Sequence, residues 1–445
     1  MSEFRVNSIT NQDGSAGPQV CGVSTFSGKS GVQIPSGPTE FRRQDGGGRG
    51  RGIIAGGITP SNQTTIDVIE IATTGDSTDF GDLSYGRAIK DVGCSSATRA
   101  LFGGGYIVGT GDSNAIDFVI ISSGGNAFDF GNLNVATLRD GGKVCNSTRG
   151  IWASGQIIPS TSPGTTNIIQ FVTMATTGDA SDFGDLTKDR RDAYGVQSST
   201  RGVFAGQETK FPTSAAVNIL DFITIATTGN AQDFGDMFES GNVTASGSSS
   251  IRGINAGGGE NGNSNTISFI TIATKGNAEN FGDLTQAIGN ASGTSSQVRF
   301  IRAGGRTPSL TDVIDFITIA TTGDATDFGD LSVARRNPAG TSDSTRGVFF
   351  GGNDSGGTNV IDFVTIQSAG NATDFGDSTS NQSNASGASD SIRGVFSAGY
   401  YGSPNLSNVI EKVIIQTAGN SVDYGDLIDE RIQGGSVSDS HGGLS

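Results

Sequence analysis

Eight segments of the chain share one pattern of apolar and polar positions. The clearest copy, residues 314–331, reads IDFITIATTGDATDFGDL: an apolar run, a polar Gly-Asp turn, and a short aromatic stretch that ends in Leu. Glycine followed by Asp or Asn supplies the positive φ that tight hairpin turns need. The pattern therefore predicts a β-hairpin with strands over residues 314–320 and 328–331 and a turn at residues 323–326.

A basic residue precedes a short apolar stretch in each copy and marks the period of the repeat. The copies follow one another about every 50 residues, a spacing typical of stacked or radial repeat architectures. No unit contains a run with helical periodicity, which argues against an α/β solenoid. The marker residues are Arg51, Arg99, Arg149, Arg201, Arg252, Arg299, Arg346 and Arg393, with His441 at the ninth position.

Each unit reads as four short strands, and the third strand is apolar on both of its faces. Residues Ile314, Phe316, Ile317 and Ile319 show this in the clearest copy. A strand with one solvated face would alternate strictly, whereas a propeller blade is covered on both faces by its neighbours. The predicted fold is therefore all-β, an eight-bladed β-propeller of four-stranded antiparallel blades.

The first part of the chain lacks the repeat and is predicted to be a separate arm. Residues 4–9 and 20–26 alternate between apolar and polar, but they hold too little apolar area to fold alone. We assign residues 1–45 to this arm and residues 46–445 to the propeller. Either residues 40–47 or the C-terminal tail could close the ring, and we favour the tail because residues 436–441 align best with the repeated GTSDST stretch.

The connections divide into two sets that lie on opposite ends of a blade. The turns between the first and second strands and between the third and fourth strands are nearly uniform, whereas the remaining loops and the blade-to-blade links vary. Variable loops on a rigid scaffold usually carry binding specificity. The candidate ligand-binding residues are Tyr106, Phe211, Arg335, Arg336, Tyr400 and Tyr401. The alternative, that the aromatic residues only cover the ends of the blades, remains open.

The repeated Asp residues raise the question of a metal site. Asp324, Asp327 and Asp330 lie close together, and calcium sites use clustered carboxylates. Other copies replace Asp with Asn, which suits an Asx-type turn, so we expect structural turns, no metal and no cofactor. We expect the marker Arg to pair with a carboxylate such as Asp330.

Composition narrows the function further. The net charge is −16, from 28 basic and 44 acidic residues, which argues against nucleic-acid binding. The chain has one His, so a Ser-His-Asp triad or a His-rich metal site is disfavoured and we expect no enzyme. The three cysteines are expected to be free thiols. The sequence shows neither a signal peptide nor the ~20-residue apolar run of a membrane helix.

The repeat resembles the kelch repeat, in which a Gly-Gly pair ends the second strand, an aromatic residue begins the fourth, and an Arg often follows. The Trp of that family is Phe here, so the similarity is one of pattern. The Gly-Gly pairs here include Gly56-Gly57, Gly104-Gly105, Gly304-Gly305 and Gly351-Gly352. The aromatic residues are Phe80, Phe130, Phe183, Phe234, Phe281, Phe328, Phe375 and Tyr424, and the later Arg occurs at Arg87, Arg139, Arg190, Arg335 and Arg431.

A second resemblance concerns the N-terminal stretch FRVNSITNQDGSAGP, which looks like the start of many tailed-bacteriophage fibre proteins; repeats of the TTGDATDFGDL kind resemble proteins of marine phages, including cyanophages. The resemblance implies a virion structural protein, a tail fibre or similar appendage, assembled in the host cytoplasm and released by lysis. Its implied partners are other virion proteins, bound through the arm, and a host-surface glycan or protein. A homo-oligomer is also implied. The alternatives are a decoration protein without receptor binding and a polysaccharide-degrading enzyme.

Overall fold

The computed structural model describes most of the repeat region. The described residues are 51–58, 61–70, 76–89, 93–96, 98–136, 141–157, 164–191, 194–197, 200–205, 208–209, 215–238, 242–249, 251–259, 263–271, 274–354, 356–382, 386–389, 392–400, 406–430 and 435–438. The predicted arm, residues 1–45, lies outside them. Within the described part no helix is long and apolar enough to cross a membrane.

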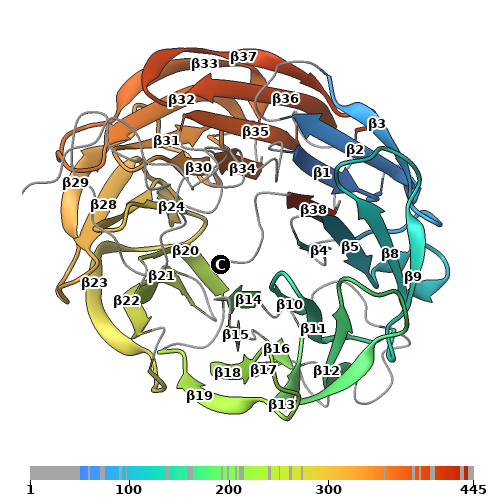
Figure 1. Ribbon diagram of the computed structural model, residues 1–445. Helices are drawn as coiled ribbons and strands as arrows, with labels where there is room; N and C mark the ends of the chain where they lie inside the picture. The colour runs from blue at the N-terminus through green and yellow to red at the C-terminus, as the bar shows by residue number, and fades with distance from the viewer. Residues whose placement is uncertain are drawn as a thin grey trace, which may run out of the picture.

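Eight four-stranded antiparallel sheets stand in a ring around a central axis, which confirms the predicted eight-bladed propeller (Figure 1). From the axis outward, blade 1 contains β38 (Gly435–Ser438), β1 (Arg51–Ala55), β2 (Thr65–Glu70) and β3 (Thr78–Asp82). Blade 2 contains β4 (Gly93–Ser95), β5 (Arg99–Gly103), β8 (Ala115–Ile120) and β9 (Phe128–Asn132). Blade 3 contains β10 (Gly142–Cys145), β11 (Arg149–Gln156), β12 (Thr165–Thr173) and β13 (Ser181–Arg190).

The remaining blades follow the same order. Blade 4 contains β14 (Tyr194–Gln197), β15 (Arg201–Ala205), β18 (Ile219–Thr224) and β19 (Gln232–Asp236). Blade 5 contains β20 (Asn242–Ser248), β21 (Arg252–Gly259), β22 (Ser264–Thr271) and β23 (Glu279–Ile288). Blade 6 contains β24 (Ser292–Ser295), β25 (Arg299–Ala303), β28 (Val313–Thr318) and β29 (Thr326–Asp330). Blade 7 contains β30 (Ala339–Ser342), β31 (Arg346–Phe350), β32 (Thr358–Thr365) and β33 (Thr373–Gln382). Blade 8 contains β34 (Ser386–Ser389), β35 (Arg393–Tyr400), β36 (Leu406–Ile414) and β37 (Thr417–Asp426).

The C-terminal tail closes the ring, as favoured from the sequence. Strand β38 pairs with β1, with Val437 opposite Ile53, and so supplies the innermost strand of the first blade. A second contact joins the last blade to the first, because the Ser77 N–H donates to the Asp426 carbonyl at 2.8 Å. The two ends of the repeat region are therefore held together by backbone pairing, as the other blades are.

Packing between blades supplies the hydrophobic core, as the doubly apolar third strand predicted. In six blades a Phe of the third strand meets a Phe of the outer strand edge to face, with ring centroids 5.6–6.0 Å apart. The marker Arg of the same blade lies over the first ring at 4.3–4.8 Å. Each of these six blades therefore carries its own Arg–Phe–Phe stack; Phe316 and Phe328 form one with Arg299.

The Gly-Asp turn of each hairpin is also a joint between blades. In blade 6, the Gly323 N–H donates to the Phe281 carbonyl of blade 5 at 2.7 Å, and the Ala325 N–H donates to the Asp283 carbonyl at 2.8 Å. The Asp283 N–H donates in return to Asp324 Oδ1 at 3.0 Å. Because most blades repeat these bonds, the turn sequence is constrained by the neighbouring blade as well as by its own hairpin.

Candidate binding face

The two ends of the propeller differ in how their connections are built. We call the end that carries the first–second and third–fourth strand turns the turn face, and the end that carries the second–third strand loops and the blade-to-blade links the loop face. On the loop face, three blades fold their loop into an additional two-stranded hairpin. These are β6 (Tyr106–Ile107) with β7 (Gly111–Asp112), β16 (Glu208–Thr209) with β17 (Ala215–Ala216), and β26 (Arg306–Thr307) with β27 (Ser309–Leu310).

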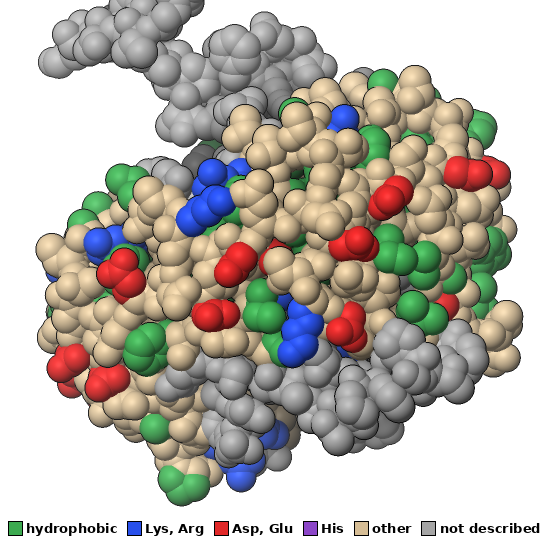
Figure 2. Space-filling view, turned by 90° about the horizontal axis from the view of Figure 1, so that it is seen from below, with side chains coloured by type: hydrophobic (Ala, Val, Ile, Leu, Met, Phe, Trp, Pro, Cys, Tyr) green, Lys and Arg blue, Asp and Glu red, His purple; other side chains and the backbone are tan. Residues whose placement is uncertain are grey.

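The Asp-rich hairpin turns have a structural explanation, as predicted. Asp327 Oδ1 accepts a hydrogen bond from the Gly329 N–H at 3.0 Å, and Asp324 already accepts from the neighbouring blade. Asn280 caps Gly282 at 3.0 Å in the same way, so Asp and Asn are interchangeable at this position. Among the described residues no three His, Cys, Asp or Glu side chains are grouped so that they could hold a metal ion. Carboxylates are spread over the rim of the ring when it is viewed from the side (Figure 2).

The predicted carboxylate partner of the marker Arg is present for Arg51, whose Nε pairs with Glu70 at 2.5 Å, but the prediction of Asp330 was wrong. Arg346 does not pair with Asp330 or another carboxylate; its Nη1 donates to the Ile415 carbonyl of blade 8 at 3.1 Å. Arg299 donates to the Ile366 carbonyl of blade 7 at 3.0 Å in the same way. The Arg therefore links its own aromatic stack to the end of the third strand in the next blade, which explains why it recurs in every unit.

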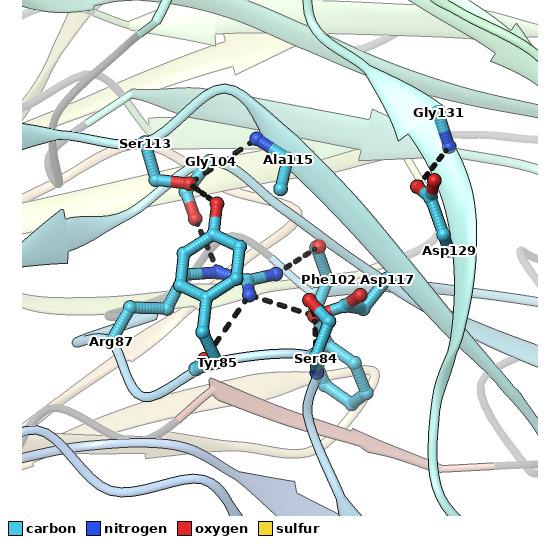
Figure 3. A network of polar contacts seen from close by, with 10 residues as sticks. All are labelled: Ser84, Tyr85, Arg87, Phe102, Gly104, Ser113, Ala115, Asp117, Asp129 and Gly131. Atoms are coloured by element: carbon cyan, nitrogen blue, oxygen red, sulfur yellow. Dashed lines mark hydrogen bonds and ion pairs between the residues drawn. The ribbon is translucent and has the colours of Figure 1, made fainter.

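A buried ionic network lies beneath the loop face where blade 1 passes into blade 2 (Figure 3). Asp117, in the middle of the apolar strand β8, accepts from Arg87 Nη1 at 2.7 Å and from the Ser84 hydroxyl at 2.9 Å. Arg87 also donates through Nε to the Gly104 carbonyl at 2.9 Å and through Nη2 to the Phe102 carbonyl at 3.0 Å. Because Arg87 comes from the link and the acceptors come from the blade, the network fixes the link against the blade that it enters.

Two further interfaces between blades use an Arg–Asp pair at the same place. Arg190 pairs with Asp221 at 2.5 Å and Arg335 pairs with Asp362 at 2.9 Å, and all four side chains are fully buried. Burial lowers the pKa of the Arg335 guanidinium, and the Asp362 charge opposes that shift. A further pair, Arg302 with Asp315, joins two neighbouring strands of blade 6 and so lies within one blade.

In blade 6 the Arg that pairs with the Asp comes from the second strand of the blade and not from the link. The link into this blade has Ile288 where the links into blades 2, 4 and 7 have Arg87, Arg190 and Arg335. Arg302 on β25 occupies a position held by Phe349 in blade 7. Both Ile288 and Arg302 are fully buried. Compared with blade 7, blade 6 therefore has its Arg on the second strand and its apolar residue in the link. The Asp keeps its place on the third strand.

The second strand of each blade ends in a turn that leads into the loop face. In blade 2, Gly104 and Gly105 have φ of 74° and 110°, and a Cβ on Gly105 would lie 2.4 Å from the Ala88 carbonyl. The next residue, Tyr106, exchanges two backbone hydrogen bonds with Ala88 of the link, at 2.8 and 2.9 Å. Arg306 pairs with Gly289, and Asn353 with Arg336, in the same manner.

The residue that follows this turn differs from blade to blade. Tyr106, Arg306 and Asn353 pair with the link, whereas Gln156 and Tyr400 continue the second strand. We call this set the loop-start ring. Its side chains include apolar, aromatic, amide, acidic and basic types, whereas the outer-strand aromatic is Phe in seven units and Tyr in one. The loop-start ring consists of Ile58, Tyr106, Gln156, Glu208, Gly259, Arg306, Asn353 and Tyr400.

The predicted ligand-binding residues have different outcomes. Tyr106 is half-buried in the loop-start ring, and Arg336 is half-buried in the link that pairs with Asn353. Tyr400 ends β35, but its side chain lies outside what the structure describes, as do Phe211 and Tyr401.

Arg335 is fully buried in its ion pair, so a ligand on the surface cannot reach it and we withdraw it as a ligand-binding candidate. The sequence analysis missed the exposed Arg306, although it directly follows a Gly-Gly pair and could have been found by comparing the residue at that place in each unit.

No protein-family model matches the chain, and no curated protein matches it. Its function must therefore be argued from its own geometry.

Proposed function

We propose that the protein is a non-enzymatic virion protein of a tailed phage, a tail fibre or similar appendage that presents its loop face to the host cell surface. The loop-start ring carries this proposal. One position of the repeat, seven residues after the marker Arg in every unit, holds side chains of different charge, size and polarity. A purely structural position would be expected to keep one residue type, as the outer-strand aromatic does, whereas variety on a fixed scaffold is typical of recognition surfaces.

The ligand would meet a surface that is already ordered. The buried Arg–Asp pairs hold three of the links directly beneath the loops, and the backbone bonds of Tyr106, Arg306 and Asn353 fasten loop to link. Little conformational entropy is then lost on binding, which favours affinity. Tyr106 and Arg306 are of the residue types that most often contribute strongly to binding.

The position of the first repeat strand favours attachment at the opposite end. Strand β1 begins at Arg51, on the turn face, where the Arg51 Nη1 donates to the Ile121 carbonyl at 2.7 Å, as the other marker residues do. Residues 1–50 therefore join the propeller at the turn face. An arm that binds other virion proteins would leave the loop face pointing away from the particle.

The phage context rests on the N-terminal stretch and on the repeat, which resemble phage fibre proteins and follow a kelch-like pattern. The proposed ligand is a host-surface glycan or protein. Adsorption of the full-length protein to a panel of bacterial cells, and to arrays of bacterial surface glycans, tests the proposal. We expect Tyr106→Ala and Arg306→Ala each to weaken binding by about tenfold, since both remove side chains of hot-spot type.

The matched control is Ile251→Ala, because Ile251 is an exposed residue on the turn face and its substitution should leave adsorption unchanged. Absence of binding to every cell and glycan, with the protein still located on the particle by electron microscopy, would overturn receptor binding and favour a decoration protein. Release of sugars from host envelope would favour a polysaccharide-degrading enzyme. Equal losses from the turn-face and loop-face variants would contradict the assignment of the binding face.

A further inference from the structure

Three equivalent turn-face positions are all apolar in blade 8 and all Thr in blade 7. The first precedes the marker Arg, the second lies opposite that Arg on the third strand, and the third lies near the start of the outer strand. In blade 8 the side chains of Ile392, Ile414 and Val422 are 50%, 37% and 55% exposed. We call these three residues the blade-8 patch. In blade 7 the same positions are Thr345, Thr365 and Thr373, all exposed.

The blade-8 patch faces blade 1. Val422 lies opposite Lys412 on the neighbouring strand, so the two side chains project to the same side, and the Tyr424 hydroxyl donates to the Glu70 carbonyl of blade 1. Ile414 lies two residues from Lys412, whose ammonium group lies over the Tyr424 ring. Large apolar side chains are therefore exposed along the border between the last blade and the first.

The N-terminal part of the chain joins the propeller at this same border. Arg51, where β1 begins, is the cross-strand partner of Glu70, the residue whose carbonyl receives the Tyr424 hydroxyl. The 50 residues that precede Arg51 therefore start beside the blade-8 patch. Ser438, the last described residue, lies opposite Gly52 on β1, but the residues that follow it, 439–445, contain one large apolar residue, Leu444.

We propose that residues 20–26 of the same chain pack on the blade-8 patch. This stretch, VCGVSTF, has no charged residue and carries Val20, Val23 and Phe26, whose side chains lose contact with water when they pack on an apolar surface. The 24 residues between Phe26 and Arg51 are long enough to reach any part of blade 8. Residues 4–9 stay available for a virion partner. The packing fixes the direction in which the arm leaves the propeller.

Hydrogen–deuterium exchange of the full-length protein, followed by mass spectrometry of peptides that cover residues 20–26, tests the proposal. In the unmodified protein these peptides should exchange at least about tenfold more slowly than an unstructured chain. Ile414→Asp should remove that protection, because a carboxylate placed in an apolar contact opposes packing. Ile392→Asp and Val422→Asp give the same test if Ile414→Asp fails to fold. Peptides from β36 and β2 report whether the propeller itself is intact.

The repeat supplies two matched controls. Thr365→Asp makes the equivalent change in blade 7, and Ile251→Asp makes it in blade 5, across the ring, where Ile251 occupies the position of Ile392 and is 64% exposed. Neither should alter exchange of residues 20–26. Fast exchange of these residues in the unmodified protein would overturn the proposal. So would equal loss of protection from Ile251→Asp, or protection that depends on protein concentration, since either result would point to a second copy covering the turn face. None of these results depends on whether the loop face binds a cell.

Discussion

The turn face and the loop face are built from the same eight blades, yet they use charge in opposite ways. On the turn face, marker residues such as Arg346 are partly exposed and donate to a carbonyl of the next blade while stacking on Phe363. Beneath the loop face, arginines such as Arg335 are fully buried and paired with a carboxylate. A neutral acceptor suffices for a cation that keeps contact with water, whereas a buried cation requires a counter-charge.

This difference separates two tasks of the scaffold. The turn-face contacts hold neighbouring blades together and recur nearly unchanged from unit to unit. The contacts beneath the loop face fasten links that lie next to loops of different length and composition. A buried ion pair tolerates little movement, so a link anchored in this way can support loops such as the one that begins at Tyr106 without transmitting their variation to the blade.

The largest effect should come from breaking one buried pair. Asp362→Ala leaves the Arg335 guanidinium buried without its counter-charge, and we expect the free energy of unfolding to fall by about 3–5 kcal/mol. Equilibrium urea unfolding measures this loss. The double variant Arg335→Met with Asp362→Leu should cost less than Asp362→Ala, because it leaves no unpaired charge. A single variant within about 1 kcal/mol of the unmodified protein would show that the pair does not hold the link.

The buried pairs also show how far the sequence could predict this molecule. The eight blades, the apolar third strand and the Asx role of the turn residues followed from periodicity and turn chemistry, which are local. The burial of Arg335 did not, because its partner Asp362 lies on the next blade. A signal was nevertheless present: an Asp interrupts the apolar run of the third strand in several units, as Asp117, Asp221, Asp315 and Asp362 do. A carboxylate in an otherwise buried strand requires a partner, and the link Arg is the repeated cation at a suitable distance along the chain.

The positions of the loop hairpins and of the paired Arg in blade 6 could not be predicted in the same way. Arg302 and Ile288 each look misplaced in their own unit, since one puts a cation in an apolar strand and the other removes the link Arg. Only the packing of β25 against the link makes the two changes compensate. The residues around a binding loop depend on such tertiary contacts, which is why Arg306 was recognised only after its pairing with Gly289 was known.

A smaller loss should follow from the matching change on the turn face. Arg346→Met removes the hydrogen bond to the Ile415 carbonyl and the contact with the Phe363 ring, and we expect a cost of about 2 kcal/mol in the free energy of unfolding. The cost is below that of Asp362→Ala because no buried charge is left behind. Arg346→Lys serves as the control, since it keeps the charge over the ring and should recover part of the loss. A loss larger than that of Asp362→Ala would reverse the proposed contrast between the two faces.

The smallest effect should have the opposite sign and lies at a turn that leads into the loop face. Ser154 has φ of 62°, a conformation that costs an L-residue energy, and glycines occupy the same position in five other blades with φ from 54° to 74°. Its side chain is buried, and its hydroxyl has no hydrogen-bond partner within the described part of the chain. Ser154→Gly should therefore raise the free energy of unfolding by about 1 kcal/mol, measured by urea unfolding beside the unmodified protein. The reverse change in blade 7, Gly351→Ser, should destabilise, because a Cβ there would lie 2.8 Å from the Gln382 carbonyl. A decrease in the free energy of unfolding on Ser154→Gly would contradict this prediction. It would indicate that the Ser154 hydroxyl makes a contact that stabilises the loop face.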